Sequence, residues 1–273
     1  MSDSKPILAI LQARTSSTRL PGKVLRPILN RPMLLWQLER IKRARSLDRI
    51  IVATSLDSSD TPLVSLCRDA AVDCFRGSLD DVLDRFYEAA RTCAPANIVR
   101  LTGDNPLIDP EIIDQVVDFH LAGEYDYSSN ALDPTFPDGL DVEVMLFSVL
   151  EQTWMEARRP SQREHVTPFI YQQRERFRCG SYKNNQDLSA WRWTVDEPED
   201  LEFVRRVYDK LHYSRPDFNM SDILGLLAEQ PDLQTINQGR QRNAGYLKSL
   251  DAENPGHDRP TDHQPGSAPE NQI

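Results

Sequence analysis

The chain has 273 residues, of which 39% are hydrophobic and 27% are charged, and it falls in the range of globular proteins. Its formal net charge of -10 disfavours general binding to nucleic acid or anionic membranes, because both require a positive protein surface. No apolar run approaches the roughly 20 residues of a membrane span, and no apolar signal core follows the start. The sequence therefore predicts a cytoplasmic protein.

The first half of the chain alternates short apolar runs with helical patterns. Strands are expected at residues 6–13, 48–55, 72–75 and 97–102, and helices at residues 32–45, 61–71 and 78–93. Asp60 is expected to cap the second of these helices. The alternation predicts βαβ units and a mainly parallel sheet with helices on both faces. Sites in such sheets lie at the carboxyl ends of the strands, so the loops after Ala13, Ser55, Phe75 and Thr102 should face one site.

The second half is less regular. A turn is expected at residues 137–139, followed by an alternating strand that ends at residue 145. Pro168 either kinks or starts a helix within residues 164–173. The other expected elements are helices at residues 110–120 and 197–211 and strands at residues 125–129, 177–182 and 191–194.

A polar loop with three cations follows the first strand. Arg14, Arg19 and Lys23 lie in it among Ser, Thr and Gly residues. Such a loop can direct backbone N–H groups at a phosphate while Arg and Lys neutralise its charge. The spacing is not that of a P-loop. Composition alone leaves a phosphate cradle and a solvated basic loop equally open.

Two aspartates occupy positions suited to magnesium. Asp104 follows Gly103 at a strand end, although an Asp before Asn-Pro also commonly bonds its own backbone. Asp196 precedes a helix and is either its N-cap or a second metal ligand. Two carboxylates and a triphosphate would supply the oxygen ligands that magnesium prefers.

These motifs together resemble the cytidylyltransferases that activate sugar acids, such as the CMP-Kdo synthetases. Residues 14–23 are similar to their ARxxSTRLPGK loop. The similarity continues through Val52-Ala53-Thr54, Arg76-Gly77-Ser78, Thr102-Gly103-Asp104 and residues 195–200. Residues 136–144 (FPDGLDVEV) and 163–168 (REHVTP) resemble the narrower SpsF-like group. The resemblance spans residues 7–211. It implies an α/β nucleotide-diphospho-sugar transferase fold of the GT-A, Rossmann-like kind, with a small β-rich subregion for the acceptor and for dimerisation.

The resemblance also implies an activity and a set of residues. A magnesium-dependent nucleotidyltransferase would move CMP from CTP to a sugar-like acceptor, release pyrophosphate, and serve surface polysaccharide or glycoconjugate synthesis. Arg14 and Lys23 would hold the triphosphate, with Arg19 and Ser17 beside them, and the three cations would stabilise the leaving pyrophosphate. Asp104 and Asp196 would hold magnesium. The other implied nucleotide contacts are Ala13, Ala53, Thr54, Arg76, Ser78 and Gly103.

The acceptor is less defined than the nucleotide. Its expected contacts are Asp138, Asp141, Glu143, Arg163 and His165, of which Asp141 and Glu143 alternate along one strand and should face the same side. An ordinary polar bond is the other interpretation of His165. Sugar-acid synthetases usually have Pro where this chain has Gln12. A sugar acid, an amino sugar and a phosphate- or phosphonate-bearing small molecule therefore all stay open as acceptors.

The expected organisation is a single cytidylyltransferase domain over residues 1–236. It comprises a nucleotide half (6–108), an acceptor half (109–212) and a helical extension (213–236), and it is expected to form a homodimer. A disordered polar tail is expected over residues 237–273. Two other functions stay open. One is a glycosyltransferase that uses a nucleotide sugar, although the usual DxD motif is replaced by Asp104-Asn105-Pro106. The other is a non-catalytic nucleotide-binding protein.

Overall fold

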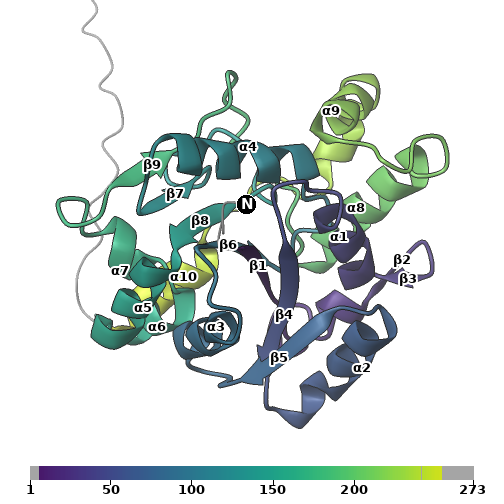
Figure 1. Cartoon of the computed structure of the whole chain (residues 1–273). Helices are drawn as coiled ribbons and strands as arrows, with labels where there is room; N and C mark the ends of the chain where they lie inside the picture. The colour runs from purple at the N-terminus through teal and green to yellow at the C-terminus, as the bar shows by residue number, and fades with distance from the viewer. Residues whose placement is uncertain (1–5, 241, 254–273) are drawn as a thin grey trace, which may run out of the picture.

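A computed structural model of the chain describes residues 6–240 and 242–253, and it contains a seven-stranded sheet in the order β5-β4-β1-β6-β8-β7-β9 (Figure 1). Its strands are β1 (Ile7–Gln12), β4 (Arg49–Ser55), β5 (Asp73–Gly77), β6 (Asn97–Thr102), β7 (Tyr127–Ser129), β8 (Glu143–Leu146) and β9 (Cys179–Ser181). Strands β5, β4, β1 and β6 are parallel, whereas β8 is antiparallel to both β6 and β7. The short strands β2 (Pro27–Ile28) and β3 (Arg31–Pro32) form a separate ribbon.

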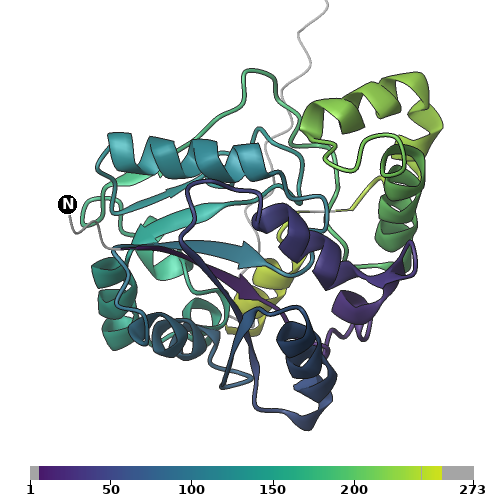
Figure 2. The same ribbon diagram turned by 45° about the vertical axis from the view of Figure 1, so that its right-hand side comes forward.

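Helices cover both faces of this sheet (Figures 1 and 2). Buried side chains of α1, α2, α4, α8 and α9 form one core, and those of α3, α5 and α7 form the other. The helices are α1 (Met33–Ile41), α2 (Thr61–Asp69), α3 (Val82–Arg91), α4 (Pro110–Ala122), α5 (Phe147–Glu156), α6 (Pro160–His165), α7 (Pro168–Tyr171), α8 (Pro198–Leu211), α9 (Met220–Glu229) and α10 (Ala244–Glu253). Three short 3-10 helices are η1 (Lys23–Leu25), η2 (Ser58–Asp60) and η3 (Pro231–Thr235). The predicted α/β fold with a mainly parallel central sheet is confirmed.

Strand β1 lies between the two cores. Ala9 and Leu11 face the core that contains α1, whereas Leu8 and Ile10 face the core that contains α3. All four side chains are fully buried. Because successive residues of a strand point to opposite faces, a run of apolar residues is the pattern that a strand covered on both faces requires.

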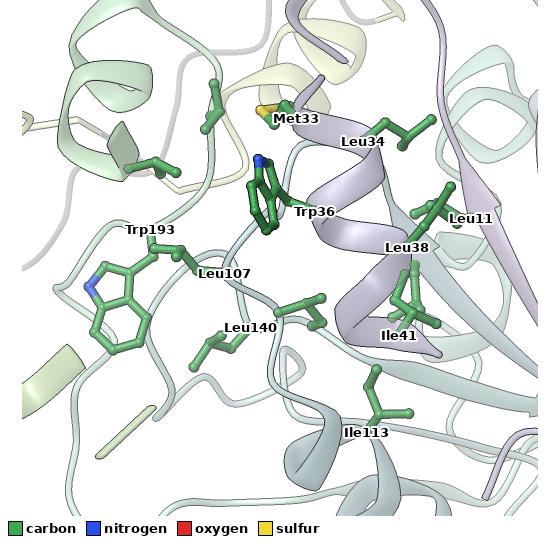
Figure 3. Close-up of a cluster of buried hydrophobic side chains, with 14 of the residues drawn as sticks. Leu11, Met33, Leu34, Trp36, Leu38, Ile41, Leu107, Ile113, Leu140 and Trp193 are labelled. Atoms are coloured by element: carbon green, nitrogen blue, oxygen red, sulfur yellow. The ribbon is translucent and has the colours of Figure 1, made fainter. Parts of the chain in front are cut away.

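Helix α1 packs its apolar side against the sheet and the acceptor half. In Figure 3, Leu38 and Ile41 lie beside Leu11 of β1, and Leu140 and Trp193 approach from the second half of the chain. All five are buried, and burying each such side chain stabilises the fold by about 1.5–3 kcal/mol. One hydrophobic core therefore joins the nucleotide and acceptor halves.

The loops at the carboxyl ends of the central strands touch one another. The N–H of Gly103 donates to the carbonyl of Gln12 over 2.7 Å, and the N–H of Ala13 donates to the carbonyl of Ala53 over 3.2 Å. A Cβ added at Gly103 would lie 2.9 Å from the Cβ of Ala13. Gly103 is thus the residue that allows the segments after β1 and β6 to approach each other.

Several expected elements differ from those observed. Residues 191–194 form no strand, because their ladder contact is limited to an isolated bridge between Arg192 and Asp138. The helix expected over residues 78–93 begins only at Val82, since Asp81 caps it by accepting from the N–H of Asp84. The helix expected over residues 164–173 is interrupted at Val166, whose φ is 69°, and α7 starts at Pro168. Helix α5 was not predicted.

The disordered tail expected from residue 237 is wrong for residues 244–253, which form α10. This helix packs on α6. Glu253 accepts a hydrogen bond from the hydroxyl of Ser161 (2.9 Å), and Ser249 is 3.0 Å from Nε2 of His165. These tertiary contacts stabilise a segment whose polar composition alone suggested disorder. Residues 254–273 of the expected tail lie outside the described residues.

Among the helices formed by residues 6–240 and 242–253, none has the length and apolar character needed to cross a bilayer. The cytoplasmic location, the homodimer and the domain boundaries stay predictions.

The close packing of Gly139 against the backbone of Trp193 and Thr194 can be tested by substitution. Its φ of +115° is unfavourable for other residues, and an added Cβ would lie 2.5 Å from the backbone N of Thr194. We expect Gly139→Ala to lower the free energy of unfolding by at least about 2 kcal/mol. Gly225→Ala is the control, because Gly225 lies in α9 with open space around it and should be neutral or stabilising by up to about 1 kcal/mol. Chemical denaturation would measure both, and equal stability of the two variants would contradict the packing of this turn.

Candidate active site

The loop after β1 is tied to the end of β4 by Asp60. This fully buried carboxylate accepts hydrogen bonds from the N–H and hydroxyl of Thr15, at 2.7 and 2.8 Å, and from the hydroxyls of Thr54 and Ser55. Burial would raise the pKa of Asp60, but these hydrogen bonds outweigh that effect and hold the pKa below its usual value. Asp60 precedes α2 as expected, yet its side chain makes no capping bond to that helix. Its position fixes the path of the basic loop.

The basic loop presents unpaired donors. It is closed by a hydrogen bond of 2.8 Å from the N–H of Gly22 to the carbonyl of Thr15. Within the described part of the chain, no hydrogen bond is donated by the N–H groups of Ser16, Ser17, Thr18 and Arg19. Within the same ranges, the Arg14 guanidinium makes no hydrogen bond or ion pair. Consecutive N–H groups without partners beside an unpaired guanidinium are an arrangement that can bind phosphate oxygens.

Lys23 brings the two predicted metal ligands together. Its Nζ lies 3.2 Å from Oδ2 of Asp104 and 2.9 Å from Oδ1 of Asp196, and it also donates to the carbonyl of Val195 over 2.9 Å. Arg19 forms a second ion pair with Oδ1 of Asp196 at 2.9 Å. The sequence therefore identified four side chains that meet, from three segments of the chain.

The charges at this meeting point stabilise one another. Burial would lower the pKa of Lys23, but Asp104 and Asp196 outweigh it, so the pKa is raised and the ammonium stays charged. Burial would likewise raise the pKa of Asp196, but the charges of Lys23, Arg19 and Arg192 outweigh it and lower the pKa. Asp196 is therefore ionised at neutral pH.

Asp196 is free to serve this site because other residues cap α8. The N-cap is Glu197, and Asp200 accepts hydrogen bonds from the N–H groups of Asp196 and Glu197, at 2.9 and 3.0 Å. The alternative interpretation of Asp196 as the helix cap is therefore wrong. Its carboxylate points instead to the basic side chains around it.

Asp104 and Asp196 fit a magnesium ion by the chemistry of their donors. Both carboxylates reach one atom, Nζ of Lys23, so a small cation could contact both. No group of three or more His, Cys, Asp or Glu side chains arranged for a metal exists within the described ranges. Magnesium commonly uses one or two carboxylates together with substrate phosphates, so a pair of aspartates is sufficient. Their role as metal ligands stays a prediction.

A buried arginine that the sequence analysis missed organises these acids. Arg192 makes a two-pronged ion pair with Asp200 (2.9 and 3.0 Å) and single contacts of 3.0 Å with Asp138 and with Oδ2 of Asp196. Its side chain is 8% exposed. One sign of this role is visible in the sequence: Arg192 lies between two tryptophans, four residues before the acidic segment that starts at Asp196.

The residues expected around the base and ribose have mainly structural contacts. Ala53 and Thr54 are buried in β4, and Thr54 donates to Asp60. Arg76 donates to the carbonyls of three residues, namely Ser55, Leu56 and Asp57. The hydroxyl of Ser78 accepts from the N–H of Asp81. Ala13 and Gly103 make the loop contacts described above, and Ser17 accepts from the N–H of Leu20 over 3.4 Å.

The expected acceptor acids all have basic partners. Glu143 accepts from Arg100, from the hydroxyl of Tyr127 (2.6 Å) and from the hydroxyl of Thr167 (2.7 Å), so its oxygens are used within the fold. Arg100 also reaches Oε1 of Gln12 over 3.3 Å. Asp138 pairs with Arg192, and Asp141 pairs with Arg242. Neither Arg100 nor Arg242 was identified from the sequence.

Arg163 and His165 have partners away from the paired aspartates. Arg163 donates to Asp81 over 2.7 Å and to the carbonyls of Trp154 and Ala157, so it joins α6 to α3 and α5. His165 contacts Ser249 of α10, and burial lowers its pKa. The structure therefore gives both residues packing contacts, and their predicted role toward the acceptor stays a prediction.

Comparison with known proteins agrees with this arrangement. The family model described as cytidylyltransferase matches residues 8–218. The spore coat polysaccharide biosynthesis protein SpsF of Bacillus subtilis is 35% identical over 238 residues, which cover 84% of this chain and 97% of that protein.

Solved structures extend the comparison. A cytidylyltransferase from Leptospira borgpetersenii serovar Hardjo-bovis is 32% identical, with a TM-score of 0.82, and the match covers 87% of this chain and 100% of that one. A CMP:2-keto-3-deoxy-manno-octonic acid synthetase complexed with CTP shares the fold, with a TM-score of 0.59 at 16% identity over 75% of this chain and 99% of that one. This chain therefore belongs to the SpsF-like cytidylyltransferases, a family of nucleotidyltransferases with the nucleotide-diphospho-sugar transferase fold.

Proposed function

We propose that the protein transfers CMP from CTP to a small sugar-like acceptor, with magnesium, and releases pyrophosphate. Membership of the cytidylyltransferase family supports CTP as the donor. A relative named for spore coat polysaccharide biosynthesis supports a role in making a surface polysaccharide or glycoconjugate. The acceptor is a sugar acid, an amino sugar or a small molecule that carries a phosphate or phosphonate.

The observation that carries this proposal is the meeting of Lys23, Asp104 and Asp196 beside a loop with free N–H groups. A triphosphate needs donors and cations for its oxygens, and it needs a metal for its remaining charge. The loop supplies the donors and Arg14, and the aspartates supply oxygen ligands. The loop and Asp104 lie at the carboxyl ends of parallel strands, which is where ligands of such sheets bind, and Asp196 reaches them from the segment before α8.

The reaction is an in-line displacement at the α-phosphorus of CTP. An acceptor oxygen forms a bond to that phosphorus, the bond to the bridging oxygen of the β-phosphate breaks, and pyrophosphate leaves with the electron pair. The proton of the acceptor group passes to solvent. Arg14, Arg19 and Lys23 stabilise the charge that develops on the leaving group. Positioning by this fixed loop supplies much of the remaining rate enhancement.

Magnesium fits this site through Asp104 and Asp196, and it would neutralise phosphate charge there when bound. Lys23 bridges the two carboxylates, so its ammonium is placed to turn toward a phosphate oxygen once a nucleotide enters. Arg192 contacts Oδ2 of Asp196, whereas Oδ1 faces Lys23 and Arg19 and is therefore the oxygen on the side of the nucleotide loop.

The first test is product identity. We expect purified protein with CTP, magnesium and a panel of sugar acids, amino sugars and phosphorylated sugars to release pyrophosphate and form a CMP-linked product. Chelation with EDTA should abolish the release, and added magnesium should restore it. A coupled pyrophosphate assay and mass spectrometry would measure both.

Two results would contradict this activity. One is the release of a nucleoside diphosphate from a nucleotide sugar, which identifies a glycosyltransferase. The other is binding of CTP without turnover of any acceptor in the panel, which identifies a non-catalytic nucleotide-binding protein.

The second test addresses the metal ligands. Asp104→Asn should lower kcat by at least about 100-fold, because one carboxylate of the pair loses its charge. Asp118→Asn is the matched control, since Asp118 is exposed on α4 and carries no part of the site. Steady-state kinetics over a magnesium series would decide, and wild-type kcat in Asp104→Asn would overturn the metal assignment.

The third test separates two arginines that the sequence placed in one site. Arg14→Ala should raise the KM for CTP about 10–100-fold and leave the unfolding temperature unchanged, because Arg14 has no partner within the described ranges. Arg76→Ala should instead lower the unfolding free energy by about 1–3 kcal/mol, because three carbonyls lose their donor. Kinetics and thermal denaturation of both variants would measure these effects. If Arg76→Ala were as stable as the wild type but had a raised KM for CTP, the predicted contact of Arg76 with the nucleotide would be supported instead.

A further inference from the structure

The segment that includes residues 237–240 and 242–253 returns to the acceptor half of the molecule. Asn237 is buried, and its Nδ2 donates to the carbonyl of Arg192 and to Oδ1 of Asp200, at 3.0 Å each. Arg240 pairs with Glu199 at 2.8 Å at the start of α8. The segment therefore begins its return in contact with Asp200, the buried acid that pairs with Arg192.

Arg242 is the deepest contact of this segment with the acceptor turn. Its Nη1 donates to the carbonyl of Phe136 over 3.1 Å, its Nη2 contacts the Asp141 carboxylate, and its Nε lies 3.8 Å from Oδ1 of Asp138. Its side chain is only 14% exposed, and its Nε is buried without a hydrogen bond to the described residues. The guanidinium thus spans residues 136–141 from one side, while Arg192 contacts Asp138 from another.

Helix α10 then covers His165, one of the two predicted acceptor residues on α6. Tyr246 packs edge-on against the ring of His165 at 5.1 Å and accepts a hydrogen bond from Gln172 over 2.8 Å. Ser249 contacts both His165 and Glu164. Three of the five expected acceptor residues, Asp138, Asp141 and His165, therefore touch this one segment.

The positive charge of Arg242 favours the ionised forms of Asp138 and Asp141. Burial raises the pKa of Asp138 and raises that of Asp141 to about 7, and the Arg242 guanidinium opposes both shifts. Within the described ranges, Arg242 is the only ion-pair partner recorded for Asp141. Loss of Arg242 would leave this partly buried carboxylate uncompensated, so it would take up a proton or move toward solvent.

We propose that residues 237–240 and 242–253 complete the acceptor site and that Arg242 is its positioning residue, holding the turn of residues 136–141 and its two carboxylates in the geometry that receives the acceptor. This inference rests on the proposed function. It assigns acceptor binding, but not nucleotide binding, to the C-terminal segment.

The kinetic test compares Arg242→Gln, Arg242→Lys and a control, Lys248→Ala, which removes an exposed charge from α10. With the acceptor found active for the wild-type protein, Arg242→Gln should raise the acceptor KM about tenfold, as expected for loss of a partly buried charge pair that positions the turn. The KM for CTP should change by less than about twofold, and kcat at saturating acceptor should stay near the wild-type value. Arg242→Lys should recover most of the loss, and Lys248→Ala should match the wild type.

A double variant tests whether Arg242 acts through Asp141. Asp141→Asn removes the charge that Arg242 compensates, so Arg242→Gln should add little to the acceptor KM of Asp141→Asn. Effects that multiply independently would overturn the inference. A rise in the KM for CTP equal to that for the acceptor, or failure of Arg242→Lys to recover activity, would overturn it as well.

A measurement without turnover keeps this inference separate from the proposed function. Amide hydrogen exchange of the nucleotide-free proteins should be faster in Arg242→Gln than in wild type or Lys248→Ala, specifically at residues 137–142 and 244–253. Unchanged exchange at residues 137–142 would refute positioning by Arg242. If wild-type protein releases no pyrophosphate with any acceptor, the proposed function fails, and the exchange result still decides the role of Arg242.

Discussion

The buried guanidinium of Arg192 is the contact on which both halves of the site depend. It joins Asp138 of the acceptor turn, Asp196 of the metal pair and Asp200 at the start of α8. Isolated charges are costly to bury, but here each carboxylate meets a donor, and Asp200 also caps two backbone N–H groups. Arg192 thus couples the acceptor turn to Asp196 by charge, and the ion pair of Lys23 with Asp196 carries this coupling to the nucleotide half.

Local patterns in the sequence predicted the elements that lie nearest the nucleotide loop. The apolar run of β1, the strand that ends at Thr102 and the helix that follows Pro198 all form where the patterns indicated. Topology predicted that the loop with Lys23 and the segment with Asp104 would face one site, because both follow strands of the parallel sheet. Asp196 precedes a helix, and the sequence left it open between helix cap and metal ligand until the family resemblance paired it with Asp104. Family resemblance then supplied what spacing could not, namely the nucleotide.

The contacts that were missed join residues far apart in the chain. Asp60 holds Thr15, Arg100 holds Glu143, and Arg242 holds Asp141, and no periodicity links the members of these pairs. Helix α10 escaped prediction for a related reason, since it depends on contacts with α6 and not on a strong apolar face of its own. The acids of residues 138–143, considered without the rest of the fold, suggested carboxylates available to an acceptor. In the structure each of them pairs with an arginine.

The reversed direction of β8 determines how the acceptor turn reaches the site. Nucleotide segments such as the one after β6 leave the sheet at its carboxyl edge, while the chain enters β8 from that same edge, with Glu143 opposite Arg100. Residues 136–142 therefore precede a strand at this edge, whereas the nucleotide segments follow strands there. The register of β8 is set by its own pairs with β6 and β7, which begin only at Glu143, so residues 136–142 lie outside the strand ladder. A substitution in this segment can therefore change the surface offered to the acceptor without moving the parallel strands that carry the nucleotide loop.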